Sequence, residues 1–284
     1  MAAAAASAGA VVGGRQFRRA RAAVAQPLGV CSGGGGLSLV ADAGALAQAA
    51  VFNAVGQPVG CEPDRWIGAA WPPSLVLQGR FCRLEALDAA RHGRDLFICL
   101  HADASRANWT YLNQGPFASL DAWQSWLANA IQAERTCYYA LIDVDSGMAQ
   151  GMAAYMNAQP EDGCVEIGGV HFSPAMRRSR LSTEAMYLML KQVFELNYRR
   201  GEWRCDAHNA SSARAALRLG FTFECLWRQR RVSKGRNRDA ACFSMLDHEW
   251  PARRLALERW LHPINFDAAG RQRCDLAHFM ARQG

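Results

Sequence analysis

The chain has 284 residues, 50% of them hydrophobic, and a formal net charge of +7. This length allows one large or two small domains with a sizeable core, and the lack of any run of about 18 uninterrupted apolar residues argues against a transmembrane helix. The positive charge favours an anionic partner, but it does not distinguish nucleic acid from a phosphorylated cofactor.

Residues 1–50 differ in composition from the rest of the chain. They are rich in alanine and glycine, carry Arg15, Arg18, Arg19 and Arg21, and contain no acidic residue before Asp42. An arginine-rich, acid-poor segment is typical of an organelle transit peptide, and a disordered low-complexity extension fits the same composition. We favour the extension and a cytoplasmic protein. Residues 51–78 then read as an extended, proline-containing arm.

Strands and helices alternate from residue 81 onward. Residues 81–87 alternate between apolar and charged side chains, which predicts a strand, and Asp88 can cap a helix that reaches about Leu100. Ser119 can cap a second helix with one apolar face. Further strands are predicted at residues 137–144, 148–156 and 164–172, the first two joined by an Asp-Ser-Gly turn.

The second half of the domain begins with the best helical pattern, at residues 183–196. A strand (203–206), a helix that stops at Gly220 (211–219), two strands (221–232 and 240–246) and a helix from Trp250 to about Leu261 follow. The order β-α-α-β-β-β-α-β-α-β-β predicts an α/β (α+β) fold, a mixed and mostly antiparallel central sheet with helices on both faces. No second domain is predicted, and residues 251–284 are expected to form a C-terminal helix and tail.

The cysteines do not show the spacing of a disulfide framework or a metal site. No CxxC pair occurs among the ten. Seven stand in apolar or strand-like runs: Cys82, Cys99, Cys137, Cys164, Cys205, Cys225 and Cys242. We therefore expect buried free thiols in a reducing compartment, and no bound metal.

The most informative stretch runs from Val165 to Ala185. A strand carrying Glu166 leads into a loop with three arginines, Arg177, Arg178 and Arg180, and the loop opens into a helix. Backbone N–H groups and the positive end of the helix dipole make such a strand–loop–helix unit an anion cradle. The alternative is an ordinary connection whose arginines are solvated.

A second signal follows one helix and one strand later, in the segment DAHNASSARAALRLGF at residues 206–221. Asn209 and Ser212 stand at the start of a short helix, and Gly220-Phe221 follows its end. Helix capping alone could explain Asn209 and Ser212. The combination with the upstream cradle is more specific than either part.

With these two segments the chain resembles the GCN5-related N-acetyltransferase (GNAT) superfamily, in the branch of the ribosomal-protein N-terminal acetyltransferases. The resemblance covers roughly Gly79–Trp250 and is strongest over Glu166–Glu224. The family's cofactor loop reads Gln/Arg-x-x-Gly-x-Gly/Ala, and this chain has Arg-Arg-Ser-Arg-Leu-Ser at residues 177–182. Arg180 and Ser182 therefore replace the two glycines, and Arg180 could add a charge-assisted phosphate contact instead.

The resemblance implies the acyl-CoA N-acyltransferase fold and acetyl-CoA as co-substrate. The strands at residues 164–172 and 203–206 would splay apart, with the pantetheine arm between them and the pyrophosphate on backbone amides of residues 178–183. The implied cofactor-binding residues are Val170, Phe172, Arg177, Arg178, Ser179, Arg180, Leu181, Ser182, Thr183, Asn209 and Ser212. The implied acceptor is a primary amine, either a protein N-terminus or a small molecule.

Transfer of an acetyl group from a thioester to an amine needs a base, because an ammonium has no lone pair. The resemblance implies Glu166 for this role, directly or through a water, and the alternative is a carboxylate that pairs with an arginine. The backbone N–H of Val170 would stabilise charge on the carbonyl oxygen if the strand bulges there. The family's frequent acid, a tyrosine, is Ala216 here, so Ser212 is the substitute, or only a helix cap.

Other features leave the function open. Residues 227–239 carry six basic residues, which we interpret as two strand ends and a Lys234-Gly235 turn bordering the substrate entrance, although a basic RNA-associated module remains an alternative. Residues 108–111 either line the acceptor pocket or belong to the core, and His171 is either a proton relay or a structural histidine. The chief alternative to an enzyme is an acyl-CoA-binding regulatory protein that has lost catalysis. We expect a monomer or homodimer that binds neither nucleic acid nor membrane.

Overall fold

The computed structural model describes residues 51–63 and 66–281, and the chain divides into two compact units after Pro63. The predictions for residues 1–50 lie outside the described residues. The described part of the first unit is an antiparallel pair of short strands, β1 (Val51–Phe52) and β2 (Pro58–Val59), within the segment predicted to be an extended arm. No helix in the described ranges is long and apolar enough to cross a membrane.

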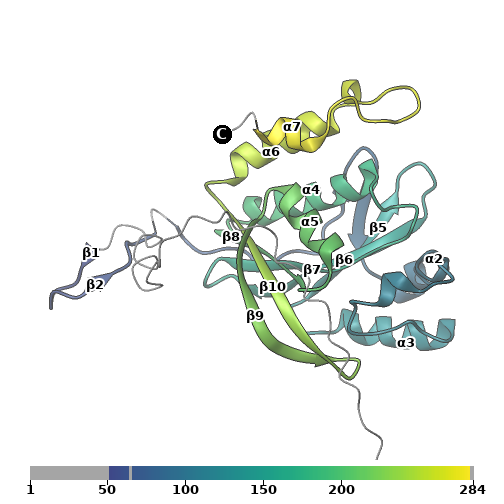
Figure 1. The fold of residues 1–284 in the computed structure, drawn as a ribbon, viewed down its shortest axis with the longest axis horizontal. Coiled ribbons are helices and arrows are strands. Elements are labelled where there is room, and N and C mark those ends of the chain that lie inside the picture. Colours follow the sequence, from purple (N-terminus) through teal and green to yellow (C-terminus); the bar gives the residue numbers. More distant parts are fainter. Residues whose placement is uncertain (1–50, 64–65, 282–284) are drawn as a thin grey trace, which may run out of the picture. The chain divides into compact units, whose positions relative to one another are not determined.

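The second unit is built on one eight-stranded sheet with the strand order β3-β4-β5-β6-β7-β8-β10-β9 (Figure 1). The strands are β3 (Leu77–Gln78), β4 (Cys82–Ala86), β5 (Cys137–Asp143), β6 (Ala149–Gln159), β7 (Cys164–Phe172), β8 (Arg200–Asp206), β9 (Thr222–Ser233) and β10 (Arg236–Leu246). Neighbouring strands are antiparallel except β7 and β8, which run parallel. The prediction of a mixed, mostly antiparallel sheet is confirmed.

Helices cover both faces of this sheet (Figure 1). They are α2 (Ala89–His101), α3 (Leu120–Ile131), α4 (Arg180–Glu195), α5 (Ala210–Leu219), α6 (Trp250–Leu261) and α7 (Leu276–Met280), with 3-10 turns η1 (Ala107–Trp109) and η2 (Pro263–Asn265). Successive strand residues face opposite sides. On β5, Tyr139 and Leu141 join the core formed with α4 to α7, whereas Ala140 and Ile142 join a second core formed with α2 and α3.

Local capping sets the helix boundaries. The Asp88 and Ser119 side chains accept from the N–H of Arg91 and Ala122, as predicted for α2 and α3. Helix α4 begins at Arg180, three residues before the predicted start, because Ser179 caps it and Ser182 completes a capping box.

Two predicted boundaries are wrong at the C-terminal end. The strands predicted to end at Val232 and to begin at Ala240 are longer, because β9 continues to Ser233 and β10 begins at Arg236. The predicted Lys234-Gly235 turn between them is confirmed. The predicted tail contains η2 and α7.

Helix α4 is fixed to the start of the sheet by a buried carboxylate. Glu184 Oε2 accepts from the N–H of Phe81 and Cys82 at 2.5 and 2.7 Å, and its Oε1 accepts from Arg80 N–H at 3.0 Å. A Cβ on Gly79 would lie 2.5 Å from Glu184 Oε2, so only glycine permits this approach. These three bonds determine where α4 lies relative to the sheet.

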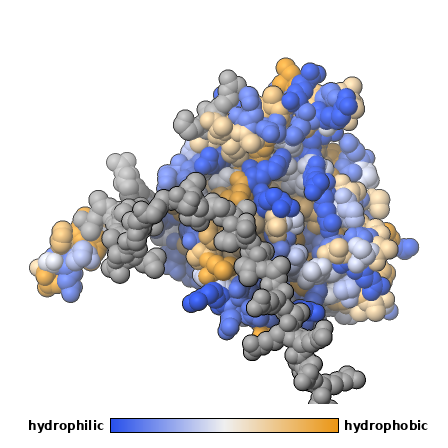
Figure 2. Space-filling view, viewed as in Figure 1, coloured by the Kyte–Doolittle hydropathy of each residue, from blue (hydrophilic) through white to orange (hydrophobic). Residues whose placement is uncertain are grey.

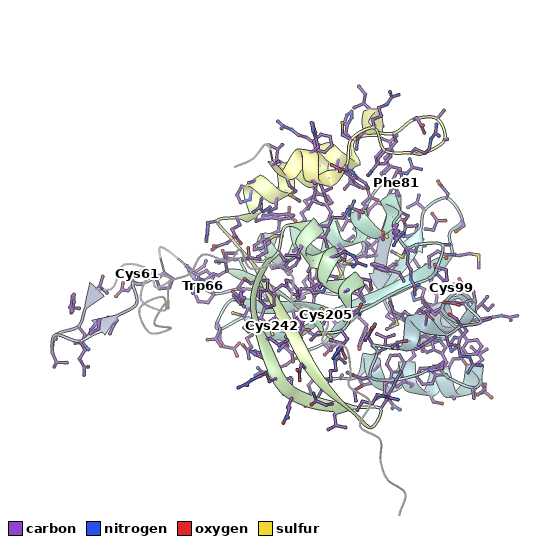
Figure 3. All side chains as sticks on the ribbon, in the orientation of Figure 1. Cys61, Trp66, Phe81, Cys99, Cys205 and Cys242 are labelled. Atoms are coloured by element: carbon purple, nitrogen blue, oxygen red, sulfur yellow. The ribbon has the colours of Figure 1, made fainter. Side chains whose placement is uncertain are left out.

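The seven cysteines singled out from the sequence form no disulfide. Cys82, Cys205 and Cys242 are buried, and the other four are partly buried. Cys205 and Cys242 lie on the neighbouring strands β8 and β10 (Figure 3). Burial raises the pKa of both thiols, so neither is a ready nucleophile. Hydrophilic residues cover most of the visible face of the second unit (Figure 2).

Replacing Glu184 with alanine should destabilise the protein strongly. Three backbone N–H groups would lose their acceptor, and we expect a loss of about 3 kcal/mol or more in the free energy of unfolding. Urea denaturation measures it. The matched control is Glu195→Ala at the exposed end of α4, where a 3.7 Å ion pair with Lys191 should contribute at most about 0.5 kcal/mol. Equal losses in the two variants would contradict this role of Glu184.

Candidate functional site

The parallel strands β7 and β8 separate partway along their length. Their pairing ends with Glu166 opposite Glu202, although β7 continues to Phe172 and β8 to Asp206. A cavity of about 1250 Å³ opens beyond this point and reaches the first turns of α4 and α5 and the β9–β10 hairpin. The splayed pair of parallel strands predicted from the sequence is present.

Strand β7 bulges inside this opening. The β6–β7 register shifts between Met152 and Ala154, so that Gly169 and Val170 have no partner on β6. Gly169 has a φ of +59°, and a Cβ there would lie 3.0 Å from the Tyr138 ring. Glycine is therefore required at the bulge. The bulge lies where the proposed role of the Val170 N–H needs it.

Glu166 lies at the point where the two strands part. Its Oε2 accepts from Asn157 Nδ2 at 2.7 Å and from Arg204 Nε at 2.9 Å, and Arg204 Nη2 forms a second contact with the same oxygen. Oε1 accepts no hydrogen bond from any described residue, and Glu166 lines the cavity. One carboxylate oxygen is thus held by the protein, and the other is available to a ligand or water.

Arg204 connects this carboxylate to the β9–β10 hairpin. Its guanidinium lies 5.4 Å from the centre of the Trp227 ring, within cation–π range. Burial works against the charge, but the hydrogen bond and charge of Glu166 keep the pKa of Arg204 above its ordinary value. Arg204 therefore remains charged between Glu166 and Trp227. The pairing that the sequence left open for Glu166 is formed, across the opening and with a residue of β8.

The start of α4 forms another wall of the cavity, lined by Arg177, Arg178, Ser182 and Thr183. Ser179 Oγ accepts from Ser182 N–H at 3.2 Å, and Thr183 N–H bonds to Ser179 O at 3.4 Å. In the described part of the chain, no acceptor is found for the N–H groups of residues 178, 180 and 181. Three unused amides at a helix N-terminus beside two arginines fit a phosphate group.

The side chain of Arg180 points elsewhere. Its guanidinium lies over the rings of Phe81 (labelled in Figure 3) and Phe266, at 4.5 and 5.1 Å from their centres. Ser179, Arg180 and Leu181 do not line the cavity. The left-handed residue of the loop is Arg178, with a φ of +54°, whereas Arg180 and Ser182 are already helical. Glycine is thus not required by backbone conformation at the two positions where the family has it.

At the start of α5, Asn209 and Ser212 have different roles in the helix cap. Asn209 is the N-cap and accepts from Ser212 N–H at 3.1 Å. Ser212 lies three residues into the cap motif, so its interpretation as the helix cap is wrong. Its Oγ accepts from Trp203 Nε1 at 3.0 Å and lines the cavity. The hydroxyl is held in place by Trp203, and it also lies within hydrogen-bond reach of the Cys205 side chain.

Of the segment 108–111, Asn108, Trp109 and Tyr111 line the cavity on the side of α2 and α3, and its role as an acceptor pocket stays a prediction. Trp109 is also buried in an aromatic cluster with Trp123, Phe117 and His171, as the core interpretation predicted. His171 Nε2 lies 3.2 Å from Asn108 Nδ2. Burial, together with Arg177 and His101, lowers the pKa of His171 to about 3. A neutral imidazole suits the structural interpretation better than a proton relay.

Sequence reasoning missed Arg204, Asn157, Trp203 and Tyr138, all of which line the cavity or hold a residue that does. Only Asn157 could have been noticed in the sequence, because it is a polar residue within an apolar strand. Asparagine also tolerates the positive φ of +50° that it adopts here. The others stand in strand patterns that do not distinguish a cavity from the core.

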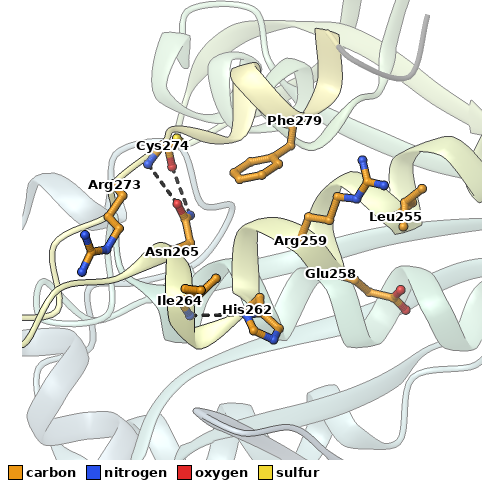
Figure 4. A pocket seen from close by; sticks show the side chains of 9 residues that line it. All are labelled: Leu255, Glu258, Arg259, His262, Ile264, Asn265, Arg273, Cys274 and Phe279. Atoms are coloured by element: carbon orange, nitrogen blue, oxygen red, sulfur yellow. Dashed lines mark hydrogen bonds between the residues drawn. The ribbon is translucent and has the colours of Figure 1, made fainter.

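A smaller cavity of about 530 Å³ lies among α6, η2 and α7 (Figure 4). Asn265 Nδ2 donates to Cys274 O at 3.1 Å, and Asn265 Oδ1 accepts from Cys274 N–H at 2.9 Å. None of the predicted site residues lines this cavity, and no group of residues suited to a metal ion occurs within the described ranges. The larger cavity is therefore the candidate site.

Comparison with known proteins identifies relatives of the domain that holds this site. The profile of the acetyltransferase (GNAT) domain matches residues 83–222. No curated protein matches the chain significantly.

Three solved structures are similar. A GCN5-related N-acetyltransferase from Brucella melitensis is 40% identical, with a TM-score of 0.75 over 77% of this chain and 100% of that one. A GNAT-family protein from Chromobacterium violaceum is 46% identical, with a TM-score of 0.65 over 69% and 98%. An acetyl transferase from Salmonella typhimurium that modifies the N-terminal serine of a 50S ribosomal subunit protein shares the fold, at 15% identity and a TM-score of 0.53 over 61% and 99%.

His171 should make stability depend on acid pH. Its pKa falls from an ordinary 6.5 to about 3 on folding, so the unfolded chain takes up a proton first as the pH drops. The free energy of unfolding should therefore decline below about pH 6.5, by up to about 2 kcal/mol at pH 5. Urea denaturation of the protein and of His171→Asn measures this, and the variant should lack that part of the decline. Identical pH dependence in the two would contradict a neutral His171.

Proposed function

Because this chain belongs to the GCN5-related N-acetyltransferase (GNAT) family, we propose that it transfers the acetyl group of acetyl-CoA directly to a primary amine, with a protein N-terminus as acceptor. The observation that carries the proposal is the opening between β7 and β8, which has the Glu166 carboxylate at its base and Arg177 and Arg178 on its wall, next to a helix start with unused amides. The N-terminal serine acceptor of the Salmonella relative supports a protein α-amine. A small-molecule amine is the alternative acceptor.

The residues around the opening suit the parts of acetyl-CoA. The amides of residues 178, 180 and 181, with Arg177 and Arg178, would hold the pyrophosphate. The edges of β7 and β8 that lack a partner, from Val170 to Phe172 and toward Asp206, would bind the pantetheine arm, and the Asn209 side chain would assist. Acetyl-CoA supplies the acetyl group as a thioester.

Each proton has a proposed carrier in the site. Glu166 Oε1, which no described residue occupies, would take the proton of the incoming ammonium, directly or through a water. The Val170 N–H at the bulge would stabilise negative charge on the carbonyl oxygen. As the C–N bond forms and the C–S bond breaks, the Ser212 hydroxyl would give its proton to the sulfur and take the second proton of the amine nitrogen in its place. Arg204 and Asn157 would position Glu166 by holding Oε2.

Two observations favour a second candidate, a protein that binds acyl-CoA without transferring the acyl group. Arg204 pairs with Glu166, and Ala216 stands where the family has its frequent tyrosine. Acetyl-CoA binding together with no thiol release on any amine would favour this second function.

Thiol release from acetyl-CoA, measured across N-terminal peptides and small amines, tests the transfer. Glu166→Gln should lower kcat by about 100-fold or more while acetyl-CoA binding is retained. The deficit should narrow at alkaline pH, where the amine arrives deprotonated. Glu202→Gln is the matched control, since Glu202 lies opposite Glu166 but pairs with Arg200 outside the cavity. Unchanged turnover in Glu166→Gln would remove Glu166 from the mechanism.

Acetyl-CoA binding should depend on the arginines at the start of α4. The double variant Arg177→Ala with Arg178→Ala should raise the dissociation constant roughly tenfold, because two charged contacts with phosphate are lost. Calorimetry measures it, with Arg271→Ala as a control because that arginine is 81% exposed and pairs with Asp267. Arg180→Ala should mainly affect stability through Phe81 and Phe266. An unaltered dissociation constant in the double variant would contradict the phosphate assignment.

A further inference from the structure

Four arginines from three neighbouring strands line the cavity on the side of the β9–β10 hairpin. They are Arg204, Arg230, Arg231 and Arg238, and we call them the arginine wall. Arg204 pairs with Glu166, and Arg238 lies 3.6 Å from Asp206. Within the described part of the chain, neither Arg230 nor Arg231 has a carboxylate at ion-pair distance. The wall thus carries two guanidinium charges that the protein itself does not neutralise.

The backbone is shaped to place these charges together. The β9–β10 register shifts between Arg238 and Ala240, where the backbone of β9 bulges at Gln229 with a φ of +49°. The bulge interrupts strict alternation, so the sequence neighbours Arg230 and Arg231 both line the cavity. Asp239, the acid next to Arg238 in the sequence, accepts from Gln229 N–H at 2.7 Å and from Asn237 at 2.9 Å. Its carboxylate therefore holds the bulge.

The arrangement is unfavourable for the empty protein. Arg231 stands directly opposite Arg238 in the strand pairing, and like charges opposite each other destabilise a sheet. Burial, then Arg238 and Arg230, lowers the pKa of Arg231, while the nearby Glu166 acts in the opposite sense. A cluster that costs stability and faces the proposed reacting carboxylate points to a ligand that carries negative charge.

Three of the four arginines are held by contacts with neighbouring residues, although Arg230 and Arg231 are themselves exposed. At the hairpin tip, Lys234 Nζ donates to Trp109 O at 2.7 Å, and Arg238 Nη1 donates to Asn113 Oδ1 at 2.5 Å. Trp227 has Arg204 and Arg230 within cation–π distance, at 5.4 and 5.3 Å from its ring centre. A guanidinium binds a carboxylate with two parallel hydrogen bonds, and the contacts of Arg204, Arg230 and Arg238 reduce the ordering that binding requires of them.

We propose that the arginine wall selects an acceptor whose reacting amine is followed closely by carboxylates, namely a peptide with an acidic N-terminal sequence. This inference rests on the proposed acetyl transfer and adds the substrate class. The amine would lie at Glu166 while the carboxylates following it would contact Arg230 and Arg231. A small amine bearing a carboxylate, such as a free amino acid, presents the same chemistry over a shorter span.

The test compares peptides of equal length that begin Ser-Asp-Glu or Ser-Lys-Lys, with free aspartate as the small-molecule arm. The acidic peptide should show a kcat/KM at least about tenfold higher than the basic one, and the advantage should shrink as salt is added. Arg230→Glu with Arg231→Glu should remove or invert the preference. The matched control is Arg228→Glu with Arg236→Glu, which changes the same charge on the same hairpin outside the cavity. It should keep the preference.

Peptide binding measured by calorimetry separates the two levels of the proposal. Tighter binding of the acidic peptide without any thiol release would support selection of acidic peptides by the arginine wall and contradict the proposed acetyl transfer. Equal kcat/KM and equal affinity for the two peptides would overturn the wall's role, as would a preference that survives Arg230→Glu with Arg231→Glu. Efficient acetylation of free aspartate, with no gain from the peptide, would replace the peptide by a small acidic amine. Single-stranded RNA that binds the hairpin and leaves peptide turnover unchanged would also overturn it.

Discussion

The ion pair between Glu166 and Arg204 is the interaction on which the site depends, because it spans the point where β7 and β8 part. Pairing of the two strands ends at Glu166 and Glu202, and Arg204 follows two residues later on β8. Two parallel strands that separate leave backbone groups without partners, which is unfavourable unless something compensates. The ion pair ties the strands across the opening. It also directs one carboxylate oxygen away from the cation.

The opening can be built only because its surroundings are rigid. Helix α4 forms one wall, and Glu184 fixes it by accepting three backbone N–H groups from residues 80–82. Ser179 and Ser182 complete the cap, and the N–H groups of residues 180 and 181 have no acceptor among the described residues. On β7, Gly169 permits the bulge that interrupts pairing with β6. Each feature is a local exception to regular structure, and together they surround one cavity.

The sequence was sufficient for the elements and the family, and insufficient for the partners of individual side chains. Alternation and capping residues predicted β7 and the starts of α2 and α3 because those signals act over a few residues. Arg180 was expected at the phosphates, yet Phe81 and Phe266, both distant in sequence, attract its guanidinium. Glu166 pairs with Arg204 because of how β7 and β8 are registered. Such contacts follow from the assembled sheet, which no local pattern encodes.

Part of the net charge of +7 is concentrated along the cavity. Arg177 and Arg178 stand at the α4 end, and Arg230 and Arg231 stand at the hairpin end. Glu166 lies where β7 and β8 part, and its Oε2 forms an ion pair with Arg204. A cavity that is cationic at both ends favours two anionic ligands with their neutral reacting groups between them. Under the proposed function, these ligands are the pyrophosphate of acetyl-CoA and the carboxylates of the acceptor. Their attraction to opposite ends would bring the thioester and the amine together beside the free oxygen of Glu166.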